Sequence, residues 1–154
     1  MLRNSLLTVH VLSVIVWLGC GLYELFLAHE LKKAAGTPGE VRLARMYLKY
    51  AAPVPIATLL VAGTGAWMAV ALHFGFFQVL WLGIKQGLMV GVLVIFASIL
   101  PPFLKFQAAV NALPEDATEL PSSVAERFRA IEPWLLVMRV LGTIAVVFAI
   151  WRPS

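Results

Sequence analysis

Five ionisable side chains lie within or at the end of long apolar stretches of this sequence and are its clearest candidates for chemistry: His10, Glu24, His73, Lys85 and Arg139. A charged group inside a bilayer is costly, so such a residue is expected to be paired or functional. Imidazole nitrogen is a good ligand for haem iron or copper. A carboxylate and a guanidinium form an ion pair, and a buried carboxylate also serves in proton relays. We therefore look for cofactor ligation and for charge pairing.

The composition places these residues in a membrane protein. Of the 154 residues, 61% are hydrophobic and 13% are charged, whereas a soluble domain has about 45–50% and about 25%. The net charge is +4, but the basic residues lie beside apolar stretches and form no run, which indicates membrane orientation rather than nucleic-acid binding. We expect a single membrane domain, residues 1–154, in contact with the lipid bilayer.

Sulfur chemistry is not expected. Cys20 is the only cysteine, which excludes an intrachain disulfide and any multi-cysteine zinc or iron–sulfur site. It lies in the middle of the first apolar stretch, where a small packing residue is expected. The five methionines are scattered, so the closely spaced sulfur ligands of a Cu(I) pathway are missing.

The apolar stretches predict four membrane-spanning helices, because about 20 apolar residues at 1.5 Å each match the roughly 30 Å hydrocarbon core. They cover about residues 5–28, 52–74, 79–104 and 134–151. The turn between the second and third stretches is short, which indicates an antiparallel pair. We expect an all-α integral membrane fold, an up-and-down bundle of four transmembrane helices. Pro101 and Pro102 are expected to kink or end the third helix.

Two shorter segments also have helical periodicity. From Glu40, apolar residues recur at helical spacing against arginines, which predicts either a helix along the headgroups or an extension of the second span. Val124 to Ile131 predicts a short amphipathic helix of its own, after an acidic, proline-containing linker. Neither segment indicates a second domain.

The basic residues predict the orientation. One side of the predicted bundle is flanked by Lys32, Lys33, Arg42, Arg45, Lys49, Lys105, Arg127 and Arg129. The other side is flanked by Arg3 and Arg152. By the positive-inside rule the long loops are cytoplasmic and both termini lie outside, in the periplasm if the protein belongs to a bacterial inner membrane.

One face of the first span carries its unusual side chains. At about 100° per residue, Trp17, Gly21 and Glu24 fall within about 40° of His10. Lipid would penalise the polar groups among them. This face is therefore expected to point into the bundle.

Depth in the membrane pairs Glu24 with Arg139, because each lies about five residues from the cytoplasmic end of its span. The structural interpretation is an ion pair that joins the first and fourth spans. The alternative is a part in moving protons to a buried site. For the ion pair, loss of one partner is expected to cost more than loss of both.

His10 and Lys85 are expected at about the same depth in the outer half of the membrane, and His73 slightly closer to the outer surface. His10 is either a neutral imidazole bonded to a neighbouring span or a ligand of haem iron or copper. The alternative for His73 is an interfacial residue that faces water. The alternative for Lys85 is a side chain that extends to the headgroups.

Gly83, Gly87 and Gly91 recur every four residues in the third span. Glycines at this spacing form a groove for close helix contact in a bilayer. This groove is the expected contact for other membrane subunits or for a second copy of the chain.

Short motifs carry a resemblance to a known family. They are His10 with Trp17 and Tyr23, Ala52-Pro53 after the arginine-bearing loop, Gly65 with Trp67, and Trp81-Leu82-Gly83-Ile84-Lys85 at the start of the third span. Over roughly residues 5–105 the chain resembles the HemJ-type protoporphyrinogen IX oxidases. It equally resembles the CopD-type copper-resistance proteins and a large group of uncharacterised four- or five-span relatives.

The resemblance implies particular roles. In HemJ-type proteins a first-span histidine and a third-span lysine are tied to haem b binding and activity, which carries over to His10 and Lys85. This sequence departs from that pattern where it has Ala97-Ser98-Ile99 in place of histidines and Leu25-Phe26 in place of a Pro-Arg pair. The uncharacterised relatives are therefore the nearer match.

Together these observations predict a polytopic membrane protein that binds haem b in a HemJ-like redox role. His10 is the expected metal ligand, His73 a further cofactor-binding residue and Lys85 the candidate catalytic residue. The alternative is a non-catalytic accessory or assembly subunit of a larger membrane complex. A third class, a small transporter, needs a polar path, which His10, Lys85, Glu24 and Arg139 would line. Whether the protein is an enzyme stays open.

Overall fold

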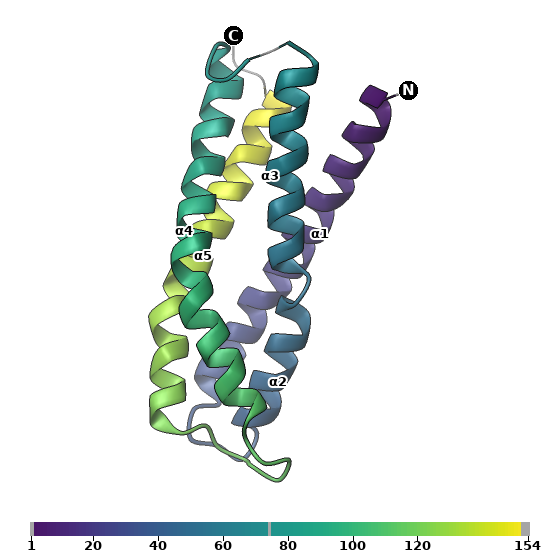
Figure 1. The fold of residues 1–154 in the computed structure, drawn as a ribbon. Helices are drawn as coiled ribbons and strands as arrows, with labels where there is room; N and C mark the ends of the chain where they lie inside the picture. The colour runs from purple at the N-terminus through teal and green to yellow at the C-terminus, as the bar shows by residue number, and fades with distance from the viewer. Residues whose placement is uncertain (1, 74, 152–154) are drawn as a thin grey trace.

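The computed structural model describes residues 2–73 and 75–151, and almost all of them are helical (Figure 1). The helices are α1 (Leu2–Lys33), α2 (Glu40–Ala51), α3 (Val54–Ala71), α4 (Leu80–Asn111) and α5 (Ser122–Trp151). Four helical segments are long and apolar enough to cross a membrane, with α2 and α3 together forming the second. The protein is therefore an all-α integral membrane protein, as the sequence predicts.

The four spans run up and down, so their connections collect at two ends of the bundle (Figure 1). At one end, α1 is connected to α2 by residues 34–39, and α4 is connected to α5 by residues 112–121. We call this end of the bundle the loop end. The start of α1, the end of α5 and the connection between α3 and α4 lie at the opposite, terminal end. The side chain of Arg3 and the whole of Arg152 lie outside the described residues.

The helix that begins at Glu40 extends the second span. The helical pattern is interrupted between α2 and α3 at Ala52 and Pro53, because Pro53 and Pro55 lack the amide protons that would continue it. The apolar face of α2 is buried against other helices of the bundle: Val41, Ala44, Tyr47, Leu48 and Ala51. The structure thus favours an extension of the span over a helix lying along the headgroups.

Two predicted helix boundaries are wrong: the end at Pro101 and Pro102, which were expected to kink or end the helix, and the separation of Val124–Ile131 from the last span. α4 continues through Pro101 and Pro102 to Asn111, and Val124–Ile131 is the first part of α5, which passes Pro133 without a break. Prolines are tolerated in membrane helices where the surrounding structure compensates for the lost hydrogen bond. Beyond Pro102, Phe106 is fully buried and packs against aromatic rings of α2 and α5, which holds the helix in place.

The bundle is built from two helix pairs, α1 with α3 and α4 with α5. The buried residues of α5 alternate at spacings of four and three: Val124, Phe128, Ile131, Leu135, Met138 and Gly142. This is the spacing of a coiled-coil seam. Arg139 beside it is also buried, and along the row Phe128 contacts α4 whereas Gly142 faces Trp17 of α1.

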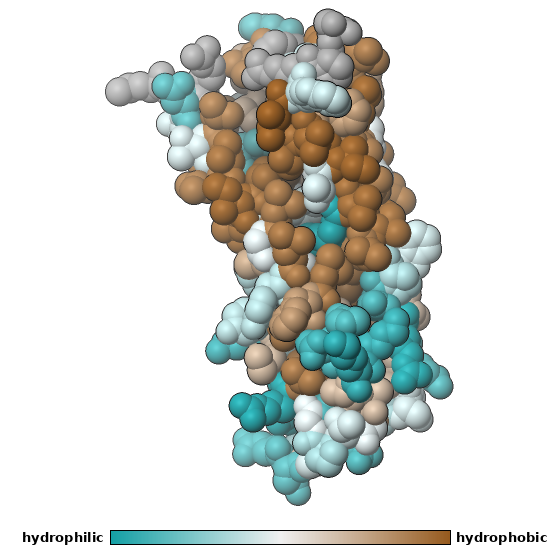
Figure 2. All heavy atoms as spheres, turned by 180° about the vertical axis from the view of Figure 1, so that it is seen from behind, coloured by the Kyte–Doolittle hydropathy of each residue, from teal (hydrophilic) through white to brown (hydrophobic). Residues whose placement is uncertain are grey.

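The two ends of the bundle are packed differently. At the loop end α1, α2, α4 and α5 share a core with an aromatic cluster of Tyr47, Phe103, Phe106 and Phe128. Toward the terminal end the two helix pairs separate, and the start of α1 diverges from α5 (Figure 1). Apolar side chains cover the terminal half while polar side chains gather at the loop end (Figure 2). The loop end thus holds the aromatic core, and its polar surface extends beyond the apolar belt.

Glu40 ties the two loops of the loop end together. Its carboxylate is buried, and one oxygen, Oε2, accepts hydrogen bonds from the amides of Gly36 and Leu120, at 3.2 and 3.0 Å. A carboxylate satisfied by backbone amides is a strong connection. It fixes the start of α2 against the segment that precedes α5.

Candidate functional site

The polar face of α1 points into the bundle. Ser13, Trp17 and Glu24 are 7%, 3% and 2% exposed, Gly21 is buried, and His10 is half-buried. The prediction that this face is turned inward is therefore confirmed. It contacts α5 and α2 near Glu24 and α3 near His10, which gives two separate polar sites.

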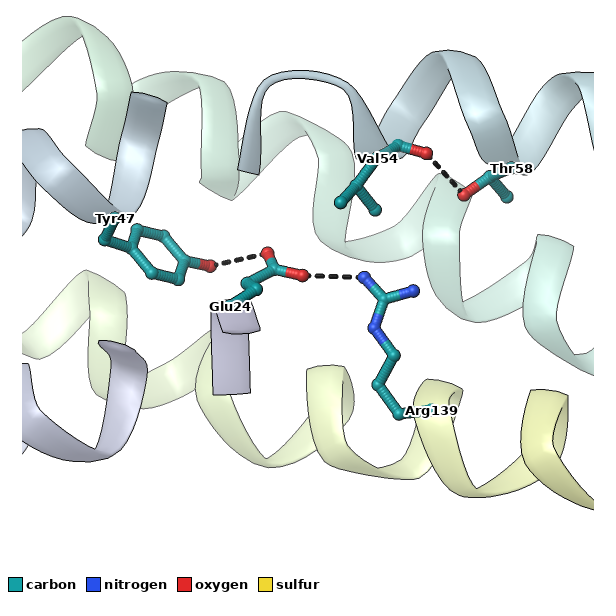
Figure 3. A network of polar contacts seen from close by, with 5 residues as sticks. All are labelled: Glu24, Tyr47, Val54, Thr58 and Arg139. Carbon is teal, nitrogen blue, oxygen red and sulfur yellow. Dashed lines mark hydrogen bonds and ion pairs between the residues drawn. The ribbon is translucent and has the colours of Figure 1, made fainter. Parts of the chain in front are cut away.

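The structure brings Glu24 and Arg139 together, as their depth predicts (Figure 3). Arg139 Nη2 donates to Glu24 Oε2 at 2.6 Å, and both side chains are 3% exposed. Tyr47 donates its hydroxyl proton to the other carboxylate oxygen at 2.9 Å. Tyr47 was not among the predicted site residues. It lies on the apolar face of α2, however, and a buried tyrosine needs a partner for its hydroxyl. The ion pair joins three helices.

Two glycines allow α1 and α5 to cross closely beside this ion pair. A Cβ on Gly21 of α1 would overlap the Arg139 guanidinium, and a Cβ on Gly142 of α5 would overlap the Trp17 indole. The guanidinium carbon lies 4.9 Å from the centroid of the Trp17 ring, a cation–π contact. Each helix thus supplies a glycine for the large side chain of the other, and we call these four residues the α1–α5 crossing.

Three donors at the α1–α5 crossing lack acceptors. Arg139 Nε, Arg139 Nη1 and Trp17 Nε1 are buried and have no hydrogen-bond partner among the described residues. An unsatisfied buried donor costs about 1–3 kcal/mol. The crossing is therefore suited to an acceptor that the chain itself does not supply.

His10 is held by α3. Its Nδ1 lies 2.9 Å from the Thr64 hydroxyl oxygen, and the hydroxyl proton of Thr64 is donated to the Leu60 carbonyl. Thr64 can then accept from Nδ1–H, and in that tautomer Nε2 carries the lone pair of the imidazole. The backbone of Val61, also in α3, is a second hydrogen-bond partner of the His10 ring. Gly65 lies alongside, where an added Cβ would come within 3.3 Å of His10 Cε1. The contacts with α3 thus orient the imidazole.

Lys85 and His73 differ in their relation to His10. Lys85 is half-buried in α4, its Nζ lies 6.0 Å from the centroid of the Trp81 ring, and its charge acts on the His10 imidazole. His73 is exposed and lies two residues past Ala71, the last residue of α3. Ala71 itself is about 10 Å along the helix from Thr64. The structure thus brings Lys85 to the level of His10 and leaves His73 apart.

The predicted glycine groove of α4 is occupied in part by the chain itself. An added Cβ would lie 3.4 Å from Phe77 at Gly83 and 3.6 Å from Leu141 at Gly91. At Gly87 nothing lies within 4 Å. Only the middle of the groove is open to a partner helix or to lipid.

Within the described part of the chain, no group of three or more His, Cys, Asp or Glu side chains could hold a metal ion. Cys20 is half-buried and packs against the core.

No family model matches the chain, and comparisons with curated proteins and with solved structures give no match. The functional interpretation accordingly depends on the two polar sites of α1.

Proposed function

We propose that this integral membrane protein binds haem b, or a similar planar redox ligand, at His10, in a HemJ-like role. The observation that carries the proposal is the hydrogen bond between His10 Nδ1 and the Thr64 hydroxyl, which in the Nδ1–H tautomer leaves the lone pair on Nε2. Ligating histidines typically have their second ring nitrogen fixed in this way by a neighbouring acceptor. A bound b-type haem would supply one-electron redox chemistry.

Other residues of the bundle fit such a ligand. Gly65 lets the imidazole pack closely against α3, and Lys85 supplies a positive charge at the same level. The unpaired donors lie deeper in the bundle, on Trp17 of α1 and on Arg139 of α5. Trp17 is seven residues from His10, or about 10 Å along α1. Haem carboxylates are suitable acceptors for these donors. Glu24 holds Arg139 in position through the ion pair.

The chain's own residues then take distinct roles. His10 binds the ligand, and Lys85 is the candidate catalytic residue, which holds a proton at Nζ near the ligand. His73 is exposed, so its part in cofactor binding stays a prediction to be tested separately. Following the positive-inside rule, we place the loop end in the cytoplasm, both termini outside, and the protein in a bacterial inner membrane.

Absorbance of the purified protein tests this proposal. After haem-replete expression we expect a Soret band, its loss in His10→Ala and its retention in His73→Ala, which removes an exposed imidazole. Circular dichroism should show equal helix content in all three proteins. Absence of the band in the wild type, or a band unchanged in His10→Ala, would overturn the proposal.

A second candidate function is supported by the exposure of α4. Gly87 has open space around it, and Val90 and Val94 beside it are exposed, so α4 offers a face for a helix of another subunit. We propose as the alternative a non-catalytic accessory subunit of a larger membrane complex. Co-purification with such a complex at fixed stoichiometry, with no cofactor, would favour it over haem binding.

A further inference from the structure

A basic hollow lies at the loop end, away from both polar sites of α1. Arg42, Arg45 and Lys49 recur at spacings of three and four along α2, so they share one face of the helix. The hollow has a volume of about 410 Å³, and its lining also includes Met46, Glu115 and Ala117. This volume is within the roughly 300–1,000 Å³ of small-molecule sites.

Positive charge dominates the hollow. Its three basic residues face one carboxylate, that of Glu115. Arg45 donates to the carbonyls of Leu113 and Pro114, at 3.1 and 2.8 Å, which fixes its guanidinium against the loop without a counter-charge.

The other two basic residues of the hollow are also without a counter-ion. Arg42 and Lys49 form no ion pair within the described residues. Lys32 and Lys33, at the same end of the bundle, pair with Glu132 and Glu30. The hollow is therefore a site of unneutralised positive charge that the neighbouring lysines do not share.

The depth of the hollow matches the headgroup layer of a bilayer. The second span, Glu40–Ala71, has 32 residues and so is about 48 Å long, which exceeds the roughly 30 Å hydrocarbon core. Tyr23 and Tyr50 form an exposed ring pair with centroids 4.8 Å apart, as in the aromatic belts at membrane interfaces. Lys49 adjoins Tyr50, so Arg42 and Arg45 lie beyond this interface, toward the loop end.

We infer that this hollow binds the phosphate group of an anionic phospholipid. Arginine binds phosphate through paired hydrogen bonds, and lysine adds a point charge. Basic pockets between membrane helices are suited to lipid headgroups for the same reason. Met46 in the lining gives the acyl side of the lipid an apolar contact. A free phosphate ion is also an anion, but its binding would not explain why the site lies at the depth of the lipid headgroups.

Lipid titration of the purified full chain in detergent tests this site. The test variant is Arg42→Gln/Lys49→Gln, which leaves Arg45 in place because it also holds the loop. The matched control is Lys32→Gln/Lys33→Gln, which removes the same charge from the same end. Binding of phosphatidylglycerol, phosphatidylcholine and inorganic phosphate is measured for each protein by native mass spectrometry and by the shift of the unfolding midpoint.

We expect phosphatidylglycerol, but not phosphatidylcholine, to bind and to raise the midpoint of the wild type and of the control. The test variant should lose at least tenfold in affinity for phosphatidylglycerol. Equal losses in both double variants, or equal binding of the two lipids, would overturn the site. Displacement of phosphatidylglycerol by an equal concentration of inorganic phosphate would overturn the lipid assignment.

The wild type provides a measurement that needs no variant. Because the site depends on charge, binding of phosphatidylglycerol should weaken at least tenfold between 50 and 500 mM NaCl. Affinity independent of salt would overturn the proposal even if the test variant failed to fold.

Discussion

Glu24 and His10 lie on the same face of α1, about 21 Å apart along the helix, yet their packing and hydrogen bonding differ. Around Glu24, three helices meet, both carboxylate oxygens have donors, and the residue is 2% exposed. Around His10, hydrogen-bond partners come from α3, and the apolar side chains nearby on α1, such as Leu7 and Leu12, are more than half exposed.

The difference follows from charge. A buried carboxylate requires a cation and further hydrogen bonds, since an unpaired charge in a dry interior costs several kcal/mol. This requirement draws α1, α2 and α5 together at the loop end. A neutral imidazole needs only one acceptor for its N–H group, so the terminal half tolerates looser packing. The first region is suited to holding the bundle together and the second to receiving a ligand.

The largest expected effect is loss of Arg139. Arg139→Met leaves the Glu24 carboxylate buried without a cation, and we expect a loss of about 3–5 kcal/mol in unfolding free energy. Glu24→Gln/Arg139→Met should be less destabilised than Arg139→Met, because the amide is neutral and still accepts from Tyr47. SDS titration followed by circular dichroism gives both values. A double variant at least as unstable as the single one would show that the pair is not coupled.

A smaller effect is expected at the α1–α5 crossing. In Gly142→Ala the new Cβ overlaps the Trp17 ring, and overpacking of this kind costs about 1–3 kcal/mol. The matched control is Gly87→Ala, where nothing lies within 4 Å and the better helix propensity of alanine should leave stability unchanged or raise it by up to about 1 kcal/mol. The same SDS titration compares them. Equal effects of the two substitutions would contradict the close crossing.

The smallest effect on stability is expected in the terminal half. Thr64→Val removes the acceptor of His10 Nδ1–H and should cost about 0.5–1.5 kcal/mol. Thr58→Val is the control, because Thr58 is also a buried threonine of α3 but donates only to the Val54 carbonyl of its own helix (Figure 3).

Haem titration tests whether Thr64 positions His10 for ligand binding, separately from its contribution to stability. If His10 is a ligand, Thr64→Val should bind haem about 10–100-fold more weakly, as for other residues that orient a ligating histidine. Thr58→Val should bind it as the wild type does. Equal haem affinities of the two variants would remove Thr64 from the proposed site.

The sequence was sufficient for the features that a bilayer imposes on each segment separately. Four apolar stretches of spanning length predict the helices, because backbone groups in hydrocarbon must be bonded within their own segment. The helical phase of α1 predicts that Trp17 and Glu24 face inward, since lipid excludes polar groups locally. Depth alone was enough to place Glu24 and Arg139 in one layer.

The tertiary structure decided what depends on several helices at once. Continuation of α4 past Pro102 depends on the packing of Phe106 against α2 and α5, and the position of Tyr47 at Glu24 depends on how α2 is rotated. The sequence does not show why positions 21 and 142 are glycine, because each glycine makes room for a large side chain of the opposite helix. Helix rotation and crossing result from many weak contacts summed over the bundle, so no single segment encodes them.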